Sequence, residues 1–203
     1  MHLHKTDVVR AATALLDDYG IADLTMRRLA RELRVSPGAL YWHFPSKQAL
    51  LGAVADLILA PVAVDDAPDG WRNCITMICG RLRNALLSHT DGAELVSASF
   101  ATGQSQVMAT LVARLSDAAT DAGVDAGHAE LAARTVVYYV LGFTADEQSR
   151  LQWDAAGADM PDTQSIYSTN PSSRFAVGVH LLLDGIAAAR PRVETHVSRG
   201  KFE

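Results

Sequence analysis

Three successive ring side chains, in the run Tyr41-Trp42-His43, combine rigid faces with hydrogen-bonding tips. Their chemistry is non-covalent recognition, because such groups can stack and hydrogen-bond against the bases and backbone of a nucleic acid. The alternative is ordinary core packing, in which Leu40 and Phe44, four residues apart, form the buried face of a helix. Three consecutive residues span most of a helical turn, so that face cannot also bury the whole run. The run therefore predicts an exposed aromatic surface that needs a partner, and a DNA groove is one.

Basic side chains flank this run, with Arg27, Arg28 and Arg31 before it and Lys47 after it. Guanidinium and ammonium groups in such positions favour contacts with phosphates. The first 50 residues carry seven Lys and Arg against five Asp and Glu, although the whole chain has a net charge of −5. A basic N-terminal part and an acidic remainder suit a protein that presents one end to DNA. The alternative is that the charges are unevenly distributed by chance.

The residues around the run have the signals of a helix, a tight turn and a short second helix. Thr25 is a typical N-cap, and the turn falls at Arg34-Val35. Ser36 can cap the next helix, Pro37 needs no hydrogen-bond donor in the first turn, and Phe44-Pro45 ends the helix. This order is that of a helix-turn-helix, whose second helix enters the major groove of DNA.

The rest of the chain is also predicted to be helical, because apolar residues recur at helical and not alternating spacing. A first helix from near Lys5 should end at Gly20 in a left-handed cap. The helix capped by Ser46 should end before Pro61, and the acidic stretch 65–70 predicts a domain boundary. Further helices are expected at Trp71–Ser88, Ala93–Phe100, Ser105–Ala122, Ala126–Gln148 and Ser172–Ala189, with a loop at Ala155–Pro171 and a polar tail after Pro191.

Composition narrows the class of protein. With 49% hydrophobic and 20% charged residues, the 203-residue chain can bury a core. No apolar run reaches the roughly 18 residues of a membrane span, and the N-terminus has no signal-peptide pattern, so we expect a cytoplasmic protein with no membrane partner. Cys74 and Cys79 are too few for a zinc site and point to different helix faces, so we expect two structural thiols. A reactive redox pair is the alternative.

The stretch Leu24–Leu51 closely resembles the DNA-binding domain of TetR-family regulators, and its core Leu40-Tyr41-Trp42-His43, followed by Lys47, resembles the tetracycline repressor branch. Trp71 and the stretch Ala85–Ala93 are similar to the effector domain of that branch. The resemblance implies an all-α homodimer with an N-terminal three-helix DNA-binding domain (1–45), a connecting helix (46–62) and a larger helical effector-binding and dimerisation domain (63–203). Its four-helix dimer interface would come from the predicted helices at 126–148 and 172–189.

The resemblance also implies contacts to phosphates and bases at matching positions of the head. Together with Arg28, taken from the basic pattern above, the predicted DNA-binding residues are Thr25, Arg27, Arg28, Pro37, Gly38, Ala39, Tyr41, Trp42, His43 and Lys47. One departure is the run Pro37-Gly38-Ala39, where the tetracycline repressor has polar side chains that read bases. We therefore expect a different operator sequence.

A small-molecule pocket in the body, whose ligand moves the two heads apart and releases DNA, is a further implication of the resemblance. The groups that would bind tetracycline with magnesium are missing, since Val96, Ala60 and Tyr138 stand where histidines are expected. Asp146 and Glu147 lie near an expected acidic position, but a lone carboxylate is a poor magnesium site. We expect no metal and no other cofactor. The predicted pocket is mainly apolar and is lined by Ile78, Leu82, Val96, Phe100, Met108, Val112 and Tyr138, for each of which plain core packing is the alternative.

These patterns predict a DNA-binding transcriptional regulator. Its partners would be palindromic double-stranded operator DNA, a second copy of the chain, and a small apolar or aromatic effector that releases a repressor from the operator. No catalytic motif of the G-x-S-x-G, H-E-x-x-H or P-loop type is present, so we do not expect an enzyme. The alternative is a helical small-molecule-binding or interaction protein without DNA binding.

Overall fold

Helices make up all the regular structure that the computed structural model describes, which comprises residues 3–63, 68–157 and 170–189. The predicted all-α class is therefore confirmed for these ranges. The helices are α1 (Lys5–Asp23), α2 (Met26–Glu32), α3 (Pro37–His43), α4 (Lys47–Leu59), α5 (Trp71–Leu87), α6 (Gly92–Ala101), α7 (Gln106–Asp121), α8 (Ala126–Ala155) and α9 (Pro171–Ala188), with a short 3-10 turn at Ala60–Val62. None of the helices in these ranges has the length and apolar content to cross a membrane.

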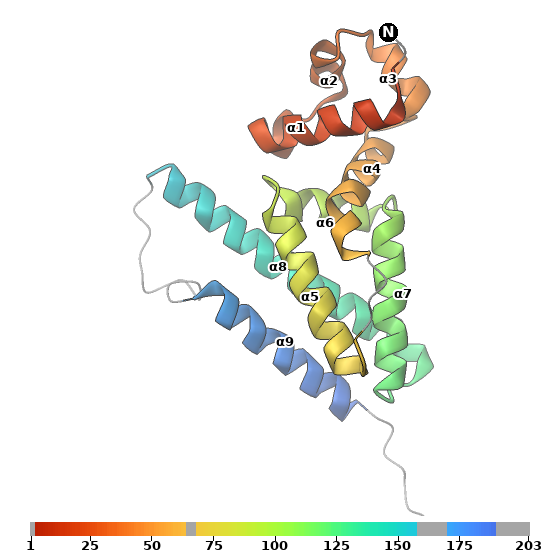
Figure 1. Cartoon of the computed structure of the whole chain (residues 1–203), viewed down its shortest axis with the longest axis vertical. Helices are drawn as coiled ribbons and strands as arrows, with labels where there is room; N and C mark the ends of the chain where they lie inside the picture. Colours follow the sequence, from red (N-terminus) through yellow and green to blue (C-terminus); the bar gives the residue numbers. More distant parts are fainter. Residues whose placement is uncertain (1–2, 64–67, 158–169, 190–203) are drawn as a thin grey trace, which may run out of the picture.

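The helices form a small head and a larger body (Figure 1). Helices α1, α2 and α3 cluster at one end, and α4 runs from that cluster into the body formed by α5 to α9. In the body, α8 packs against α5, α6, α7 and α9. The predicted division at 1–45, 46–62 and 63–203 stays a prediction, and α4 packs against both α1 and the body helices.

Side-chain caps set the starts of α2, α3 and α4 as the sequence predicts. The Thr25 hydroxyl accepts a hydrogen bond from the Arg28 backbone N–H at 3.1 Å. The hydroxyls of Ser36 and Ser46 accept from backbone N–H groups three residues later, at 3.3 and 3.1 Å. Each cap satisfies a donor that the first helical turn leaves free, so these starts are fixed by local chemistry.

Two predicted helix boundaries differ from the structure. Gly20 has the expected positive φ of 77°, but the chain returns to helical geometry and continues to Asp23. Helix α8 continues past Gln148 to Ala155, through residues that have no apolar stripe and are exposed apart from the half-buried Arg150. The predicted loop Ala155–Pro171 is thus shorter at both ends, and its residues 158–169 and the tail after Pro191 lie outside the described residues.

Polar contacts join α1 of the head to the turn between α5 and α6. The Asp17 carboxylate lies 3.0 Å from Nδ1 of His89 and accepts from the Thr90 backbone N–H at 3.2 Å. The Asp91 carboxylate accepts from the Ile21 backbone N–H at 2.9 Å. These bonds connect the end of α1 directly to the body, independently of α4.

A second junction joins α4 to the start of α7. The Asp56 carboxylate accepts hydrogen bonds from the Ser105 hydroxyl at 2.6 Å and from the Val107 backbone N–H at 3.0 Å. A carboxylate at a helix N-terminus is favoured by the free N–H groups and the helix dipole. The connecting helix is therefore held by the turn between α6 and α7.

Candidate nucleic-acid interface

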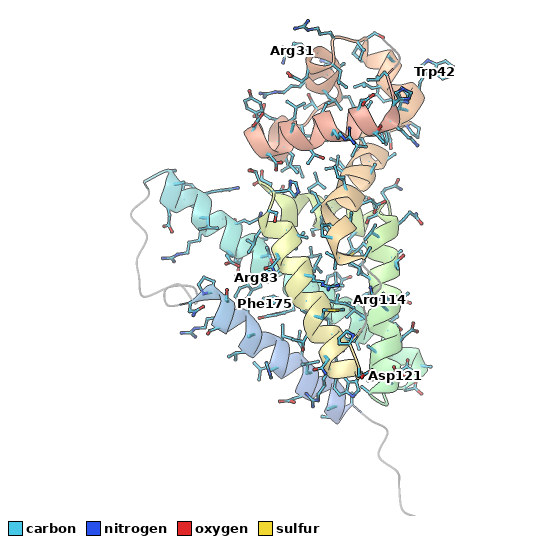
Figure 2. All side chains as sticks on the ribbon, in the orientation of Figure 1. Arg31, Trp42, Arg83, Arg114, Asp121 and Phe175 are labelled. Carbon is cyan, nitrogen blue, oxygen red and sulfur yellow. The ribbon has the colours of Figure 1, made fainter. Side chains whose placement is uncertain are left out.

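Helix α3 separates a buried face from an exposed aromatic face, as its spacing predicts. Leu40 and Phe44 are 0% and 3% exposed and belong to the hydrophobic core. Tyr41 and Trp42 are 49% and 91% exposed. Figure 2 shows Trp42 pointing away from the head into solvent. A tryptophan this exposed gains almost nothing from burial within the described fold, so its place on the surface favours a partner.

The turn before α3 fixes the angle at which that helix leaves α2. Arg34 has a positive φ of 55°, which is the left-handed region that most residues avoid. The Val35 backbone N–H then donates to the Ala30 carbonyl at 2.9 Å, which closes the end of α2. The predicted turn at Arg34-Val35 is confirmed, and it completes the helix-turn-helix.

The predicted DNA-binding residues lie at the N-cap of α2, on α2 and α3, and at the first residue of α4. The exposed ones are Thr25, Arg27, Pro37, Gly38, Tyr41 and Trp42, and the half-buried ones are Arg28, Ala39, His43 and Lys47. Arg31 is also exposed, and Figure 2 shows Arg31 and Trp42 at the end of the molecule that is farthest from α9. The structure thus exposes Arg27, Arg31, Tyr41 and Trp42 on the surface of the head.

Arg28 has a second role that the sequence pattern did not predict. Its guanidinium forms an ion pair with Asp23 and lies 3.8 Å above the ring centroid of Tyr19. Both partners come from α1, so Arg28 holds α2 against α1. Its phosphate contact stays a prediction, while Arg27 carries an exposed guanidinium on the same helix.

Lys5 is a residue of this end that sequence reasoning did not single out. Its ammonium nitrogen lies 5.2 Å from the ring centroid of Phe44, which directly follows α3. The N-terminal end of α1 therefore brings a cation beside the end of α3. The only sequence signal for it was its charge, because the approach of α1 to α3 is a tertiary contact.

The residues predicted to line an effector pocket lie in different surroundings, and their role in a pocket stays a prediction. Four of them, Ile78, Leu82, Val96 and Met108, are at most 1% exposed and fill the core, which was the alternative. Phe100 and Val112 do line a cavity of about 370 Å³ between the α6–α7 turn, α7 and α8. Tyr138 is 56% exposed, and its ring lies 5.8 Å from that of Phe100.

Among the described residues of the body, the titratable groups give no arrangement suited to a metal ion or a reactive thiol. In the described ranges, no three or more His, Cys, Asp or Glu side chains are grouped for metal binding. Both carboxylate oxygens of Glu147 accept from Arg83, at 2.6 and 2.9 Å. Burial raises the pKa of Cys74 and raises that of Cys79 to about 12, so both are protonated thiols at neutral pH.

Comparison with known proteins agrees with this geometry. Residues 8–54 match the model of bacterial regulatory proteins of the tetR family, and residues 64–164 match the tetracyclin repressor-like C-terminal domain. This chain belongs to the TetR family. Among curated TetR-family relatives, the class C tetracycline repressor of Escherichia coli is 31% identical, over 93% of this chain and 92% of the relative. The members matched here are regulators and not enzymes.

Two solved TetR-family structures are more similar still. Mycobacterium smegmatis BioQ is 61% identical, with a TM-score of 0.86, over 93% of this chain and 99% of that chain. BioQ in complex with its natural double-stranded DNA operator is 59% identical, with a TM-score of 0.80, over 92% of this chain and 99% of that chain. In that relative, the same fold is thus seen with operator DNA.

Proposed function

We propose that this TetR-family regulator is a cytoplasmic repressor that binds a palindromic operator as a homodimer and is released by a small effector. The observation that carries DNA recognition is the exposed aromatic face of α3, in which Trp42 is 91% exposed above the buried Leu40. The operator complex of the similar BioQ supports this use of the head.

Each part of the head has a task in the proposed complex. The start of α3 carries the small residues Gly38 and Ala39, so its backbone can approach base edges closely in the major groove. Tyr41 and Trp42 would contact sugar and phosphate beside the helix. Arg27 would neutralise a phosphate, in line with the basic character of this end.

Helices α8 and α9 carry the surface that we propose for the homodimer. Leu131 and Tyr138 on α8 are 61% and 56% exposed, and Val177 and Leu181 on α9 are 59% and 69% exposed. Large apolar side chains that are exposed on two adjacent helices favour burial against a second copy of the chain. Two copies packed in this way would present two α3 helices to half-sites about one DNA turn, roughly 34 Å, apart.

We place the effector in the 370 Å³ cavity between the α6–α7 turn, α7 and α8, which lies within the usual size range of ligand pockets. Ser105 is part of its wall, and the Ser105 hydroxyl also donates to Asp56 of α4 at 2.6 Å. An occupant that moves this turn would move α4 and the head. Release then follows if the ligand prefers the moved state.

Operator binding should depend strongly on salt, and Lys47 should contribute to that dependence. Replacing Lys47 with Ala should weaken binding about equally for all duplexes and reduce the slope of log affinity against log salt by about one, because one phosphate contact is lost. The measurement is fluorescence anisotropy of a labelled palindromic duplex, taken from beside the protein's own gene, at increasing KCl.

The exposed Gln48→Ala variant on the same helix is the matched control and should keep the parent slope. If the parent chain bound the duplex without salt dependence or not at all, it would be an interaction protein without DNA binding. A parent-like slope for Lys47→Ala would remove Lys47 from the interface.

A further inference from the structure

We propose that the effector of the α6–α8 cavity is an amphipathic organic carboxylate, with an apolar chain or ring inside the cavity and its carboxylate bound by Arg134. This inference rests on the proposed function, in which that cavity takes the releasing ligand. It adds a chemical class and a recognition residue that the apolar pocket predicted from the sequence did not contain.

The cavity wall combines apolar residues with polar groups from the α6–α7 turn, α7 and α8. Its residues are Phe100, Gly103 and Ser105 from α6 and the following turn, Ala109, Val112, Ala113 and Ser116 from α7, and Glu130 and Arg134 from α8. Such a wall suits a ligand with an apolar body. The charged pair on α8 supplies the means to fix one polar end.

Arg134 is held in place by three neighbours. Its guanidinium carbon lies 5.2 Å from the ring centroid of Phe100, and its Nε donates to Glu130 at 2.8 Å. Hydrogen bonds to Glu130 and to the Tyr138 hydroxyl raise the pKa of Arg134, so it stays charged. A guanidinium that is already ordered loses little conformational freedom when it binds a ligand, and its planar fork matches a carboxylate.

A ligand carboxylate can replace Glu130 as the partner of Arg134. Glu130 and Arg134 are an i,i+4 pair on one helix, and their side chains are 65% and 40% exposed. Pairs of this kind contribute little because solvent screens them. The Arg83–Glu147 pair is different, since both side chains are 10% exposed and both carboxylate oxygens are used. Arg134 is thus an ordered cation in the wall of this cavity, and a ligand carboxylate that bonds to it would leave Glu130 to the solvent, to which that side chain is already 65% exposed.

The test measures binding of simple probes to the full chain by calorimetry and the release of a bound operator duplex by anisotropy. The probes are hexanoate, octanoate and phenylbutyrate, each with its neutral amide, and octylamine. We expect at least one carboxylate to bind about tenfold or more tightly than its amide, because a charge-assisted hydrogen bond is lost in the amide. The same carboxylate should release the operator.

Arg134→Gln should remove the preference for carboxylate over amide and leave operator binding without probe unchanged. The matched control is Arg150→Gln, which alters another arginine of α8 that also lies near an acid four residues away, and it should keep the preference. Arg134→Lys retains the charge without the fork and should keep part of the preference, so the test remains decisive if the Gln variant fails to fold.

The proposal is overturned if every amide binds as tightly as its carboxylate, if octylamine binds better, or if Arg134→Gln keeps the parent preference. If the chain binds its operator but gives one of these results, only the proposed class of ligand is contradicted. A chain that binds no operator contradicts the proposed function itself.

Discussion

Replacing Glu147 with Leu should destabilise the fold by about 3–5 kcal/mol, because it would leave Arg83 as an unpaired buried charge. Both residues are 8% exposed, and two hydrogen bonds of 2.6 and 2.9 Å join them. The guanidinium of Arg83 also lies 5.2 Å from the ring centroid of Phe175 on α9. Figure 2 shows Arg83 and Phe175 next to each other between α5 and α9. Urea unfolding at one fixed protein concentration measures the change.

A second, exposed ion pair provides the matched control. Arg72 of α5 and Asp184 of α9 are 3.1 Å apart, with side chains 46% and 73% exposed, so Asp184→Ala should cost no more than about 1 kcal/mol. The double variant Arg83→Met with Glu147→Leu should recover most of the lost stability, since no charge is left buried. Equal effects of the exposed and buried single variants would contradict a role for this pair in joining α5, α8 and α9.

Replacing Gly52 with Ala should both destabilise the protein and weaken operator binding. A Cβ at position 52 would lie 2.4 Å from the carbonyl oxygen of Gln104 and 2.8 Å from its carbonyl carbon. These are backbone atoms of the α6–α7 turn, so α4 must move away from the turn, at a cost of about 1–3 kcal/mol. The head moves with α4, and an orientational cost of only about 1.4 kcal/mol lowers operator affinity tenfold.

Thermal unfolding and operator anisotropy on the same preparations measure the two effects. Gly80→Ala is the control, because a Cβ there meets nothing within 4 Å and alanine favours the helix by up to about 1 kcal/mol. If Gly52→Ala matched the parent in both measurements, the close packing of α4 on this turn would not set the position of the head.

Local chemistry explains what the sequence could predict of the fold. Thr25, Ser36 and Ser46 start helices by bonds to N–H groups three residues away, so a short stretch of sequence is enough to predict each start. The end of α8 is not determined by such local interactions. Beyond Gln148 the apolar stripe stops, and one contact that holds this part is the bond from the Gln152 side chain to Asp91 at 2.5 Å. A contact across so many residues leaves no periodic signal.

The candidate sites also contain some features that follow from local sequence and others that depend on contacts between distant residues. The exposure of Tyr41 and Trp42 follows from helix geometry once Leu40 is assigned to the core. The residues of the proposed effector cavity could not be predicted in this way, since an apolar side chain such as Val96 has the same character in a core as in a cavity wall. Arg134 was not predicted because its spacing from Glu130 is that of any surface ion pair.

The most direct test of DNA recognition by α3 is the affinity of the Trp42→Ala variant for the operator duplex. Because Trp42 is 91% exposed, stability should stay within about 0.5 kcal/mol of the parent and the dimer should remain intact. Operator affinity should fall about tenfold or more, as for truncation of an aromatic anchor at an interface. A folded, dimeric Trp42→Ala variant that bound the operator as tightly as the parent would contradict recognition through this face.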